Sequence, residues 1–335
     1  MATSVKFGLT LPNRMVILGV GSIQDIISMG VDAEETGLFQ SLWVGDSILA
    51  KRRPESVALL GALAARTQRV RLGVGCMASF PIRNPFILAA QWATLDMIAG
   101  PDRMILAACL GGAGGGGDWE MEQDAFGVPT GQRVRRMIEN IEALKALWTQ
   151  EKASYEGQYV NFSDVISEPR PLTRPHPALW IAANPRPVND DTSVIQKATR
   201  RVARLADGWM TTMVTPQTFG ERWHTILDAR AELGKDTASF DNTLYYNANI
   251  NEDKEAAFNE SKKFLDDYYS RDWPKELVEL WVAHGSPQEV VERIKSFAEA
   301  GAKEITIRIT SYDQRGQLER LVKEVLPAFQ TVGAR

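Results

Sequence analysis

The chain has 335 residues, of which 44% are hydrophobic and 24% charged, with a formal net charge of -4. This length can bury a large core, and the composition is typical of a globular protein. Basic residues are scattered and no apolar run is long enough to span a bilayer, so neither nucleic acid nor a membrane is expected as a partner. The start of the chain lacks a secretory leader pattern, and two cysteines cannot build a disulfide framework. A cytoplasmic location is expected.

Strand-like and helical runs alternate along the chain. In the first half, strands are expected over 4–12, 41–46, 69–76 and 103–110, and helices over 22–35, 54–68, 84–100 and 131–148. The second half begins with two short alternating runs around Glu156 and Gly157, which predict a hairpin. Further strands are expected over 178–183, 208–214, 243–250 and 303–310. Helices are expected over 193–206, 216–233 and 314–329, and one or two more helices are expected between residue 250 and residue 300.

These runs form eight strand-then-helix units without a linker between them. Several strands are apolar on both faces, as in a parallel sheet covered by helices. We therefore predict a single α/β domain over residues 1–335, a TIM-type (β/α)8 barrel, with insertions near 150–176 and 251–285. An open, doubly wound sheet is the alternative.

A glycine-rich stretch, "CLGGAGGGGDWE" at 109–120, follows the fourth predicted strand. Gly112, Gly114 and Gly117 match the spacing G-x-G-x-x-G, but a dinucleotide-binding turn must open a helix directly. The next helix is expected only near Gln132, which argues against that fold. The stretch is either a mobile loop that admits a bulky planar ligand or a flexible surface connector.

Several stretches together resemble the bacterial luciferase-like monooxygenase superfamily. They include "LWVGDS", the region from "RVRLGVGCMASF" to "RMILAACLGG", "FGVPTGQRVRRMIENIEALKALW", "YEGQYVNF", "PHPALWIAANPRP", "RRVARLADGWM" and "GSPQEVVERIKSFAEAGAKEITIRI". The resemblance spans nearly the whole chain. It implies a β/α barrel that uses reduced FMN, supplied by a separate flavin reductase, or the related deazaflavin coenzyme F420. A homodimer is expected by the same analogy.

The resemblance also implies site residues. Cys109 falls where luciferase has a reactive cysteine, and Arg133 matches an arginine near the cofactor phosphate in some members. The positions implied to contact the cofactor are Gly75, Cys76 and Met77 at a bulge that often has a non-proline cis peptide, Ala182, Ala183 and Asn184 at the phosphate, and Trp209, for which core packing is the competing interpretation.

One departure from the family concerns the end of the second strand. Many members have Asp-His there, whereas this chain has Asp46 and Ser47. A serine lacks the basicity of histidine near neutral pH. The acidic residue of sugar-phosphate dehydrogenases after the fourth strand is also replaced by glycine near Gly112. Both differences argue against hydride transfer, and leave Cys109, Ser47 and Asp46 as catalytic candidates, although Asp46 is equally well explained as a cap.

Other polar residues have structural explanations. The three histidines lack ligand spacing, so no metal site is expected. The two cysteines have no base beside them and are expected to be small buried hydrophobes. Asp96 and Arg103 are expected at the closed end of the barrel, paired with each other. Arg308 lies within a strand, where a charge must face a polar mouth or a partner.

The favoured function is an FMN-dependent monooxygenase that oxygenates a small organic substrate with O2. The first alternative is an F420-dependent hydride-transfer oxidoreductase, favoured if basic residues such as Arg186 receive the longer acidic tail of that coenzyme. The second alternative is a flavin-binding protein without turnover.

Overall fold

The computed structural model describes residues 5–112, 116–187 and 191–330. The strands are β1 (Lys6–Leu11), β2 (Ser41–Val44), β3 (Arg71–Met77), β4 (Met104–Ala108), β5 (Ala153–Glu156), β6 (Asn161–Val165), β7 (Ala178–Ala182), β8 (Gly208–Thr211), β9 (Asp241–Ile250), β10 (Val282–Gly285) and β11 (Glu304–Ile309). The α-helices are α1 (Ile23–Glu35), α2 (Ser56–Arg66), α3 (Pro85–Ala99), α4 (Trp119–Phe126), α5 (Arg133–Thr149), α6 (Ser193–Leu205), α7 (Pro216–Glu232), α8 (Lys254–Tyr269), α9 (Lys275–Trp281), α10 (Pro287–Glu299) and α11 (Gln314–Arg320).

The main sheet closes into a parallel barrel. Within the described residues, its eight strands pair in the order β9, β11, β1, β2, β3, β4, β7, β8, and β8 pairs back to β9. This closure confirms the predicted (β/α)8 barrel and excludes the open sheet. Strand β10 pairs with β9 beside the barrel, and β5 with β6 forms the predicted hairpin.

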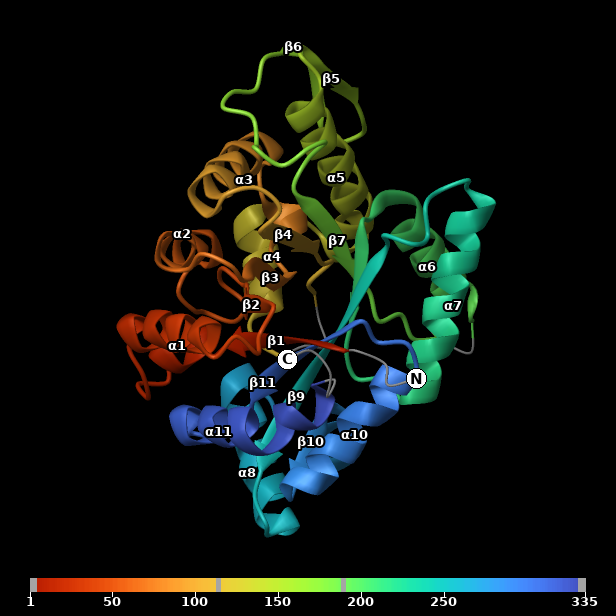
Figure 1. Ribbon diagram of the computed structural model, residues 1–335. Coiled ribbons are helices and arrows are strands. Elements are labelled where there is room, and N and C mark those ends of the chain that lie inside the picture. The colour runs from red at the N-terminus through yellow and green to blue at the C-terminus, as the bar shows by residue number, and fades with distance from the viewer. Residues whose placement is uncertain (1–4, 113–115, 188–190, 331–335) are drawn as a thin grey trace.

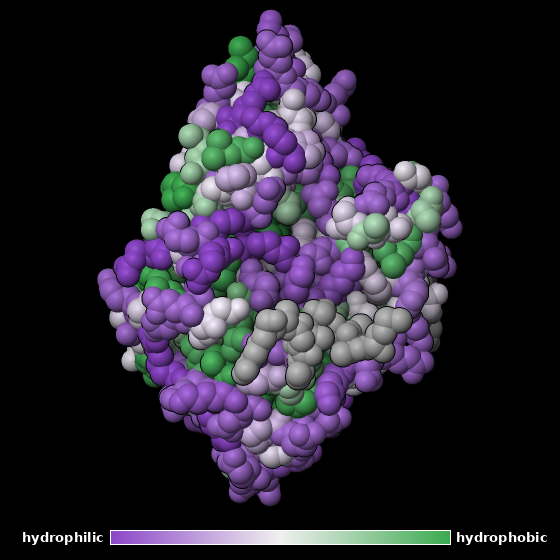
Figure 2. All heavy atoms as spheres, viewed as in Figure 1, coloured by the Kyte–Doolittle hydropathy of each residue, from purple (hydrophilic) through white to green (hydrophobic). Residues whose placement is uncertain are grey.

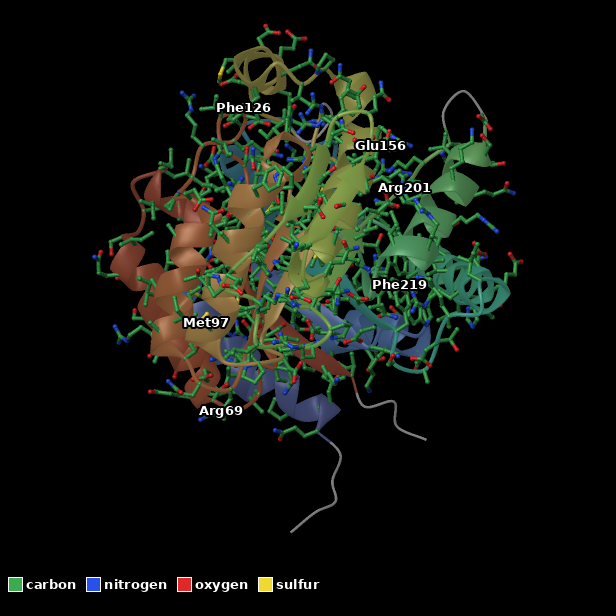
Figure 3. The ribbon with its side chains drawn as sticks, turned by 90° about the horizontal axis from the view of Figure 1, so that it is seen from above. Arg69, Met97, Phe126, Glu156, Arg201 and Phe219 are labelled. Atoms are coloured by element: carbon green, nitrogen blue, oxygen red, sulfur yellow. The ribbon has the colours of Figure 1, made fainter. Side chains whose placement is uncertain are left out.

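Helices surround the strands on all sides, and the β5–β6 hairpin projects beyond α3 and α5 (Figure 1). The face of the molecule in that view is mostly hydrophilic, with apolar residues in separate small groups (Figure 2). The view turned by 90° shows Arg69, which precedes β3, and Phe126, which ends α4, at opposite ends of the barrel (Figure 3). The loops that follow the strands therefore gather at the end marked by Phe126.

Two tryptophan rings fill the barrel interior, and two glycines leave room for them. Trp43 of β2 and Trp180 of β7 are buried, with ring centroids 5.7 Å apart. A Cβ on Gly73 would lie 2.4 Å from the Trp43 ring, and one on Gly208 would lie 2.5 Å from the Trp180 ring. Glycine within a strand marks such close approach, so these positions make room for the indoles.

Local signals explain most helix boundaries. Ser22 and Asp25 form a capping box at the start of α1, and the Asn84 side chain accepts the N–H groups of Phe86 and Ile87 at the start of α3. Both caps satisfy donors that the first helical turn leaves without a backbone partner. The expected starts at 22 and 84 are correct to within one residue.

Four expectations about the elements need correction. Helix α4 starts at Trp119, just after the glycine stretch, so the argument that no helix opens there before Gln132 was wrong. Strand β10 replaces part of the helical stretch up to 300. The last helix ends at Arg320 and continues as a π turn (Leu321–Val325) and a 3-10 turn (Leu326–Phe329).

The fourth correction concerns Asp96 and Arg103, which do not pair with each other. Asp96 accepts hydrogen bonds from the Thr173 N–H, at 2.8 Å, and the Thr173 hydroxyl, at 2.7 Å. Arg103 donates to the carbonyl oxygens of Thr67, Val70 and Ala99. Each residue forms hydrogen bonds with backbone groups at the closed end of the barrel. Both residues are therefore structural, as expected, although the expected ion pair between them does not form.

Glu34 stabilises the turn between α2 and β3. Its carboxylate is buried at the end of α1 and accepts the backbone N–H groups of Gln68, Arg69 and Val70. Burial alone would raise its pKa, but these three donors together lower the pKa below the ordinary value. The lowered pKa means that the carboxylate contributes stability above the pKa of the unfolded chain, and that this contribution is lost as the pH falls through the folded pKa.

We expect Glu34→Ala to lower the free energy of unfolding at pH 7 by about 1–3 kcal/mol, the cost of leaving buried donors without a partner. Glu35→Ala is the matched control, because Glu35 follows in the same helix and is exposed. Urea denaturation of both variants at pH 7 and pH 3 measures the effect. The difference between them should shrink at pH 3, and equal stabilities at pH 7 would contradict this role.

Candidate active site

A cavity of about 320 Å³ opens where the barrel strands end. It is lined by residues at or after the ends of seven strands, among them Gly45, Cys76, Cys109, Ala182, Met210, Tyr245 and Arg308. This end of a β/α barrel carries the active site in enzymes of this architecture. A larger hollow of about 620 Å³ lies outside the barrel beside β10, lined by Glu279, His284 and Arg293 among others. That hollow has none of the predicted site residues, so we place the candidate site in the barrel mouth.

The end of β3 forms one wall of the cavity. The Gly75–Cys76 peptide is cis, and the pairing of β3 with β4 shifts between Val74 and Met77. The bulge with a non-proline cis peptide, which the family resemblance implies, is therefore present. Gly75 and Cys76 line the cavity, whereas Met77 points into the core and is fully buried.

The side chains of Asp46 and Ser47 form hydrogen bonds with residues of neighbouring segments. Asp46 lines the cavity, but its carboxylate accepts hydrogen bonds from the Ser56 hydroxyl, from Ser79, and from Arg83 at 2.9 Å. The Ser47 hydroxyl accepts the backbone N–H of Lys51 at 2.8 Å. Both residues hold the loop after β2 in place, which agrees with the cap interpretation of Asp46.

The two cysteines form a thiol pair at the ends of β3 and β4. Both are half-buried, and both line the cavity. The hydrogen bond from Cys76 lowers the pKa of Cys109 to about 7, with further contributions from the Gly111 N–H and Lys51. The same hydrogen bond and burial raise the pKa of Cys76. Each thiol is thus the hydrogen-bond partner of the other, and whether the two cysteines are only small buried hydrophobes stays untested.

Lys51 reaches the same cavity from the loop after β2. Its side chain is buried, and its Nζ lies 5.0 Å from the Trp119 ring centroid and 5.2 Å from that of Tyr269. Burial, followed by repulsion from Arg53, lowers the pKa of Lys51 to about 7. An amine with this pKa exchanges a proton near neutral pH, which Ser47 cannot do.

Arg308 brings a buried guanidinium to the cavity from β11. Its exposed fraction is 1%, and its Nη1 donates to the Tyr269 hydroxyl at 2.9 Å. Its centre lies 4.2 Å from the Tyr268 ring centroid and 5.1 Å from that of Tyr245. The structure thus confirms that this charge within a strand faces the polar mouth.

At the opposite side of the mouth, the cavity is lined by Ala182, Ala183 and Asn184. The Asn184 amide donates to the Thr212 carbonyl at 2.6 Å. Beyond them, Arg222 donates to the Pro185 carbonyl, and the charge of Arg186 contributes to lowering its pKa after burial. Neither arginine forms an ion pair within the described part of the chain.

Besides Met77, two predicted cofactor residues, Arg133 and Trp209, lie outside the cavity lining. Arg133 is buried and donates to the carbonyls of Leu110, at 2.6 Å, and Ala78, at 3.2 Å. Trp209 donates to the Ala183 carbonyl and stacks on Trp223 in the core, which agrees with its packing interpretation. Arg133 therefore holds the start of the glycine stretch, and any contact of either residue with a cofactor stays a prediction.

Gly111 and Gly112 also line the cavity, whereas residues 113–115 of the glycine stretch lie outside the described residues. Gly111 has φ 59°, and a Cβ there would lie 2.4 Å from the Ala78 carbonyl oxygen. A side chain at Gly111 would therefore clash with backbone. Gly111 and Gly112 bring bare backbone to the cavity, and the admission of a planar ligand by this stretch stays a prediction.

Several lining residues were not predicted from the sequence, namely Lys51, Arg53, Tyr245, Tyr269, Trp273 and Trp281. Lys51 and Arg53 follow a strand end, which is the one signal that could have found them. The four aromatic residues come from β9, α8, the loop after α8, and α9. Nothing in their local sequence distinguishes them from core residues.

The cavity suits a planar, acceptor-rich cofactor. Its walls combine the bare backbone of Gly75 and Gly111 with the apolar side chains of Met210 and Met213. The indole Nε1 atoms of Trp273 and Trp281 and the Arg308 Nε are buried without an acceptor among the described residues. A flavin or deazaflavin ring would fit between the glycine backbone and the two methionines, and a substrate beside it would offer acceptors to these three donors. No group of described residues has the composition of a metal site, and no described helix is long and apolar enough for a membrane span.

Comparison with known proteins gives consistent matches. The family model described as luciferase-like monooxygenase matches residues 5–304. The F420-dependent glucose-6-phosphate dehydrogenase of Kineococcus radiotolerans is 25% identical over 335 residues, covering 91% of this chain and 93% of the relative. Two solved structures share the fold. An F420-dependent secondary alcohol dehydrogenase has a TM-score of 0.80 at 16% identity, covering 98% of this chain and 99% of its own. The monooxygenase RslO1 from Streptomyces bottropensis has a TM-score of 0.77 at 23% identity, covering 97% and 100%.

The thiol pair predicts selective alkylation of Cys109. Because the thiolate is the reactive form, iodoacetamide at pH 7 should modify Cys109 roughly tenfold faster than Cys76. The Cys76→Ala change removes the donated hydrogen bond and should raise the pKa of Cys109, which slows its alkylation at pH 7. Peptide mass spectrometry over a pH series measures both rates. Equal rates for the two cysteines, or no shift in Cys76→Ala, would contradict the described pair.

Proposed function

The chain belongs to the luciferase-like monooxygenase family, and from this premise we propose that it is an oxidoreductase that uses coenzyme F420 for hydride transfer. Its substrate is a small organic molecule held in the barrel mouth. The observation that carries this proposal is Lys51, whose Nζ lies in the cavity with a pKa lowered to about 7.

Lys51 reverses the argument that the sequence analysis drew from Ser47. The missing histidine favoured a monooxygenase over proton-coupled hydride transfer, because no acid or base was visible near the second strand. Lys51, four residues after Ser47, supplies such a group. The relative from Kineococcus radiotolerans is named as an F420-dependent dehydrogenase, and it supports the hydride-transfer alternative better than the FMN-dependent monooxygenase.

The residues available to hold the coenzyme follow from the cavity. The Gly75–Cys76 bulge would support the ring, and Asn184 with the neighbouring backbone would face its phosphate. Arg186 and Arg222 lie just beyond Asn184, where two guanidinium groups would attract the acidic tail of F420. The shorter FMN has no such tail, so this basic pair favours the deazaflavin.

The chain's own groups then have distinct tasks. The bound coenzyme would supply hydride transfer. Lys51 would accept the substrate hydroxyl proton at Nζ during oxidation, and would return it during reduction. Aromatic residues of the cavity would exclude water, which strengthens electrostatic interactions in the site. Asp46 would act through the loop it fixes rather than by moving a proton itself, because Ser56, Ser79 and Arg83 already occupy its oxygens.

The coenzyme preference can be measured directly. We expect oxidised F420 to bind the apoprotein at least about tenfold more tightly than FMN, because Arg186 and Arg222 add charge-assisted contacts. Anaerobic titrations with each coenzyme in oxidised and reduced form, followed by quenching of the nine tryptophans, report the dissociation constants. The Arg186→Gln variant should lose most of the preference, whereas Arg200→Gln, on the surface of α6, should keep it. Tighter binding of reduced FMN would return the protein to the monooxygenase alternative, with O2 and a reductase as partners.

Replacing Lys51 tests the proton-transfer role. Lys51→Met should lower kcat with any accepted alcohol by about 10²–10⁴-fold, the usual contribution of a general base, while F420 binding stays unchanged. Because only the neutral amine accepts a proton, alcohol oxidation by the unchanged protein should rise as the pH rises through about 7. That limb should be absent in Lys51→Met and present in Lys152→Met, an exposed control.

A second readout does not depend on activity. Peptide-mapped acetylation of the apoprotein should show the reactivity of Lys51 rising through about pH 7, well below the ordinary lysine value of about 10.4, and the exposed Lys152 serves as the reference peptide. A Lys51 midpoint near the ordinary value would remove the base from the proposal.

A further inference from the structure

The cavity has a cationic side made of Arg53 and Arg308. Both line the cavity, and neither forms an ion pair within the described part of the chain. Arg14 lies behind them and donates to the Tyr268 carbonyl and to the Ser270 hydroxyl, again without a described carboxylate partner. Asp46 is the one carboxylate among the described lining residues, and Arg83 already neutralises it. The cavity therefore carries positive charge that no described group of the protein balances.

One edge of the Arg308 guanidinium has no described hydrogen-bond partner. Its Nη1 is used by the Tyr269 hydroxyl, whereas its Nε is buried without an acceptor and its Nη2 has no hydrogen bond to a described residue. These two atoms form the planar donor pair that binds both oxygens of a carboxylate. A buried guanidinium left in this state is unfavourable unless a ligand supplies the acceptors.

Arg53 lines the same cavity from the loop after β2. Its guanidinium packs against Gly45 so closely that a Cβ there would lie 2.2 Å from its Nη1. Its Nε donates to the Lys51 carbonyl at 3.0 Å, and its centre lies 5.6 Å from the Tyr268 ring centroid. The centre of the Arg308 guanidinium lies 4.2 Å from the same ring centroid, so both cations lie close to one tyrosine. Burial alone would raise the pKa of Tyr268, yet Arg308, Arg53 and Arg14 together lower it.

The wall beside Arg308 is aromatic. Tyr269 lies 5.3 Å from Trp281 and 5.8 Å from Trp273, and Tyr245 lies 6.1 Å from Trp281, as ring centroids. Such faces accommodate an apolar body. The cationic side is also separated from Asn184, Arg186 and Arg222, which lie after β7 and on α7, across the barrel from β11 and β2. The coenzyme tail and this anion would therefore occupy different places.

We propose that the substrate is a small organic carboxylate with an apolar body, whose carboxylate binds Arg308 and Arg53 and whose body lies against Tyr269, Trp273 and Trp281. This inference rests on the proposed function, since it names the substrate class of the same site. It separates this chain from the relative named for glucose 6-phosphate, a compound that has neither a carboxylate nor an apolar body.

The test uses the apoprotein and three probes: benzoate, its uncharged analogue benzamide, and glucose 6-phosphate. Binding is measured as quenching of the protein's tryptophan fluorescence, to which Trp273 and Trp281 contribute. We expect benzoate to bind about tenfold or more tightly than benzamide, as for a charge-assisted pair, and more tightly than glucose 6-phosphate. Inorganic phosphate at the same concentrations shows whether any anion suffices.

Variants connect this preference to the two arginines. Arg53→Gln and Arg308→Gln should each remove most of the preference for benzoate over benzamide. Arg52→Gln is the matched control, since Arg52 precedes Arg53 but is exposed and pairs with Asp118 at 3.6 Å. If the buried Arg308→Gln variant does not fold, Arg53→Gln carries the test alone.

Two results would overturn the proposal. Equal binding of benzoate and benzamide would show that no anion is recognised, and tighter binding of glucose 6-phosphate or inorganic phosphate would assign the cationic side to a phosphate instead. The coenzyme titration is independent of both. F420 binding without a benzoate preference would contradict only the proposed substrate class. A benzoate preference without F420 binding would contradict only the proposed coenzyme and reaction.

Discussion

Inside the barrel, Trp43 of β2 and Trp180 of β7 lie in contact, and their rings rest on Gly73 and Gly208. Below them, the buried Glu304 carboxylate is bound by Arg71 at 2.7 Å and by the Ser41 hydroxyl at 2.8 Å. The barrel is therefore filled at its closed end, and ligand can occupy only the end where the strands terminate. The cavity residues come from segments distant in the sequence, and this packing is what sets the depth at which they meet.

The same arrangement explains why the cavity is cationic and yet largely apolar. Lys51, Arg53 and Arg308 would repel one another in a dry site, but each lies close to a tyrosine or tryptophan ring. The ring faces attract cations and partly offset the missing carboxylates. What remains of the repulsion is visible in Lys51, whose pKa falls to about 7 through burial and then through Arg53. Charge retained at such a cost is typical of a binding site rather than of a stabilising core.

The sequence predicts the barrel well because each strand-then-helix unit carries its own signal. Apolar runs, Ser22 and Asn84 caps, and the hairpin at Gly157 are all local. Helix α4 was missed because "WEMEQDAF" is short and polar and follows a glycine stretch. The site is harder, since Lys51 is an ordinary loop lysine until Trp119 and Tyr269 bury it. Arg308 could be singled out because a charge within a strand conflicts with its local pattern, but its three tyrosine neighbours come from β9 and α8.

The two proposals about the cavity are physically coupled. An anion between Arg308 and Arg53 would offset the charge that, after burial, contributes most to lowering the pKa of Lys51. The amine would then bind a proton more tightly with substrate present than in the empty cavity. Displacement of water by the apolar body acts in the opposite direction, because it increases the burial of the same amine. The proton affinity of Lys51 during the reaction is thus set by the balance of these two effects. Both depend on Arg53, which donates to the Lys51 carbonyl and so holds the charge and the base at a fixed separation.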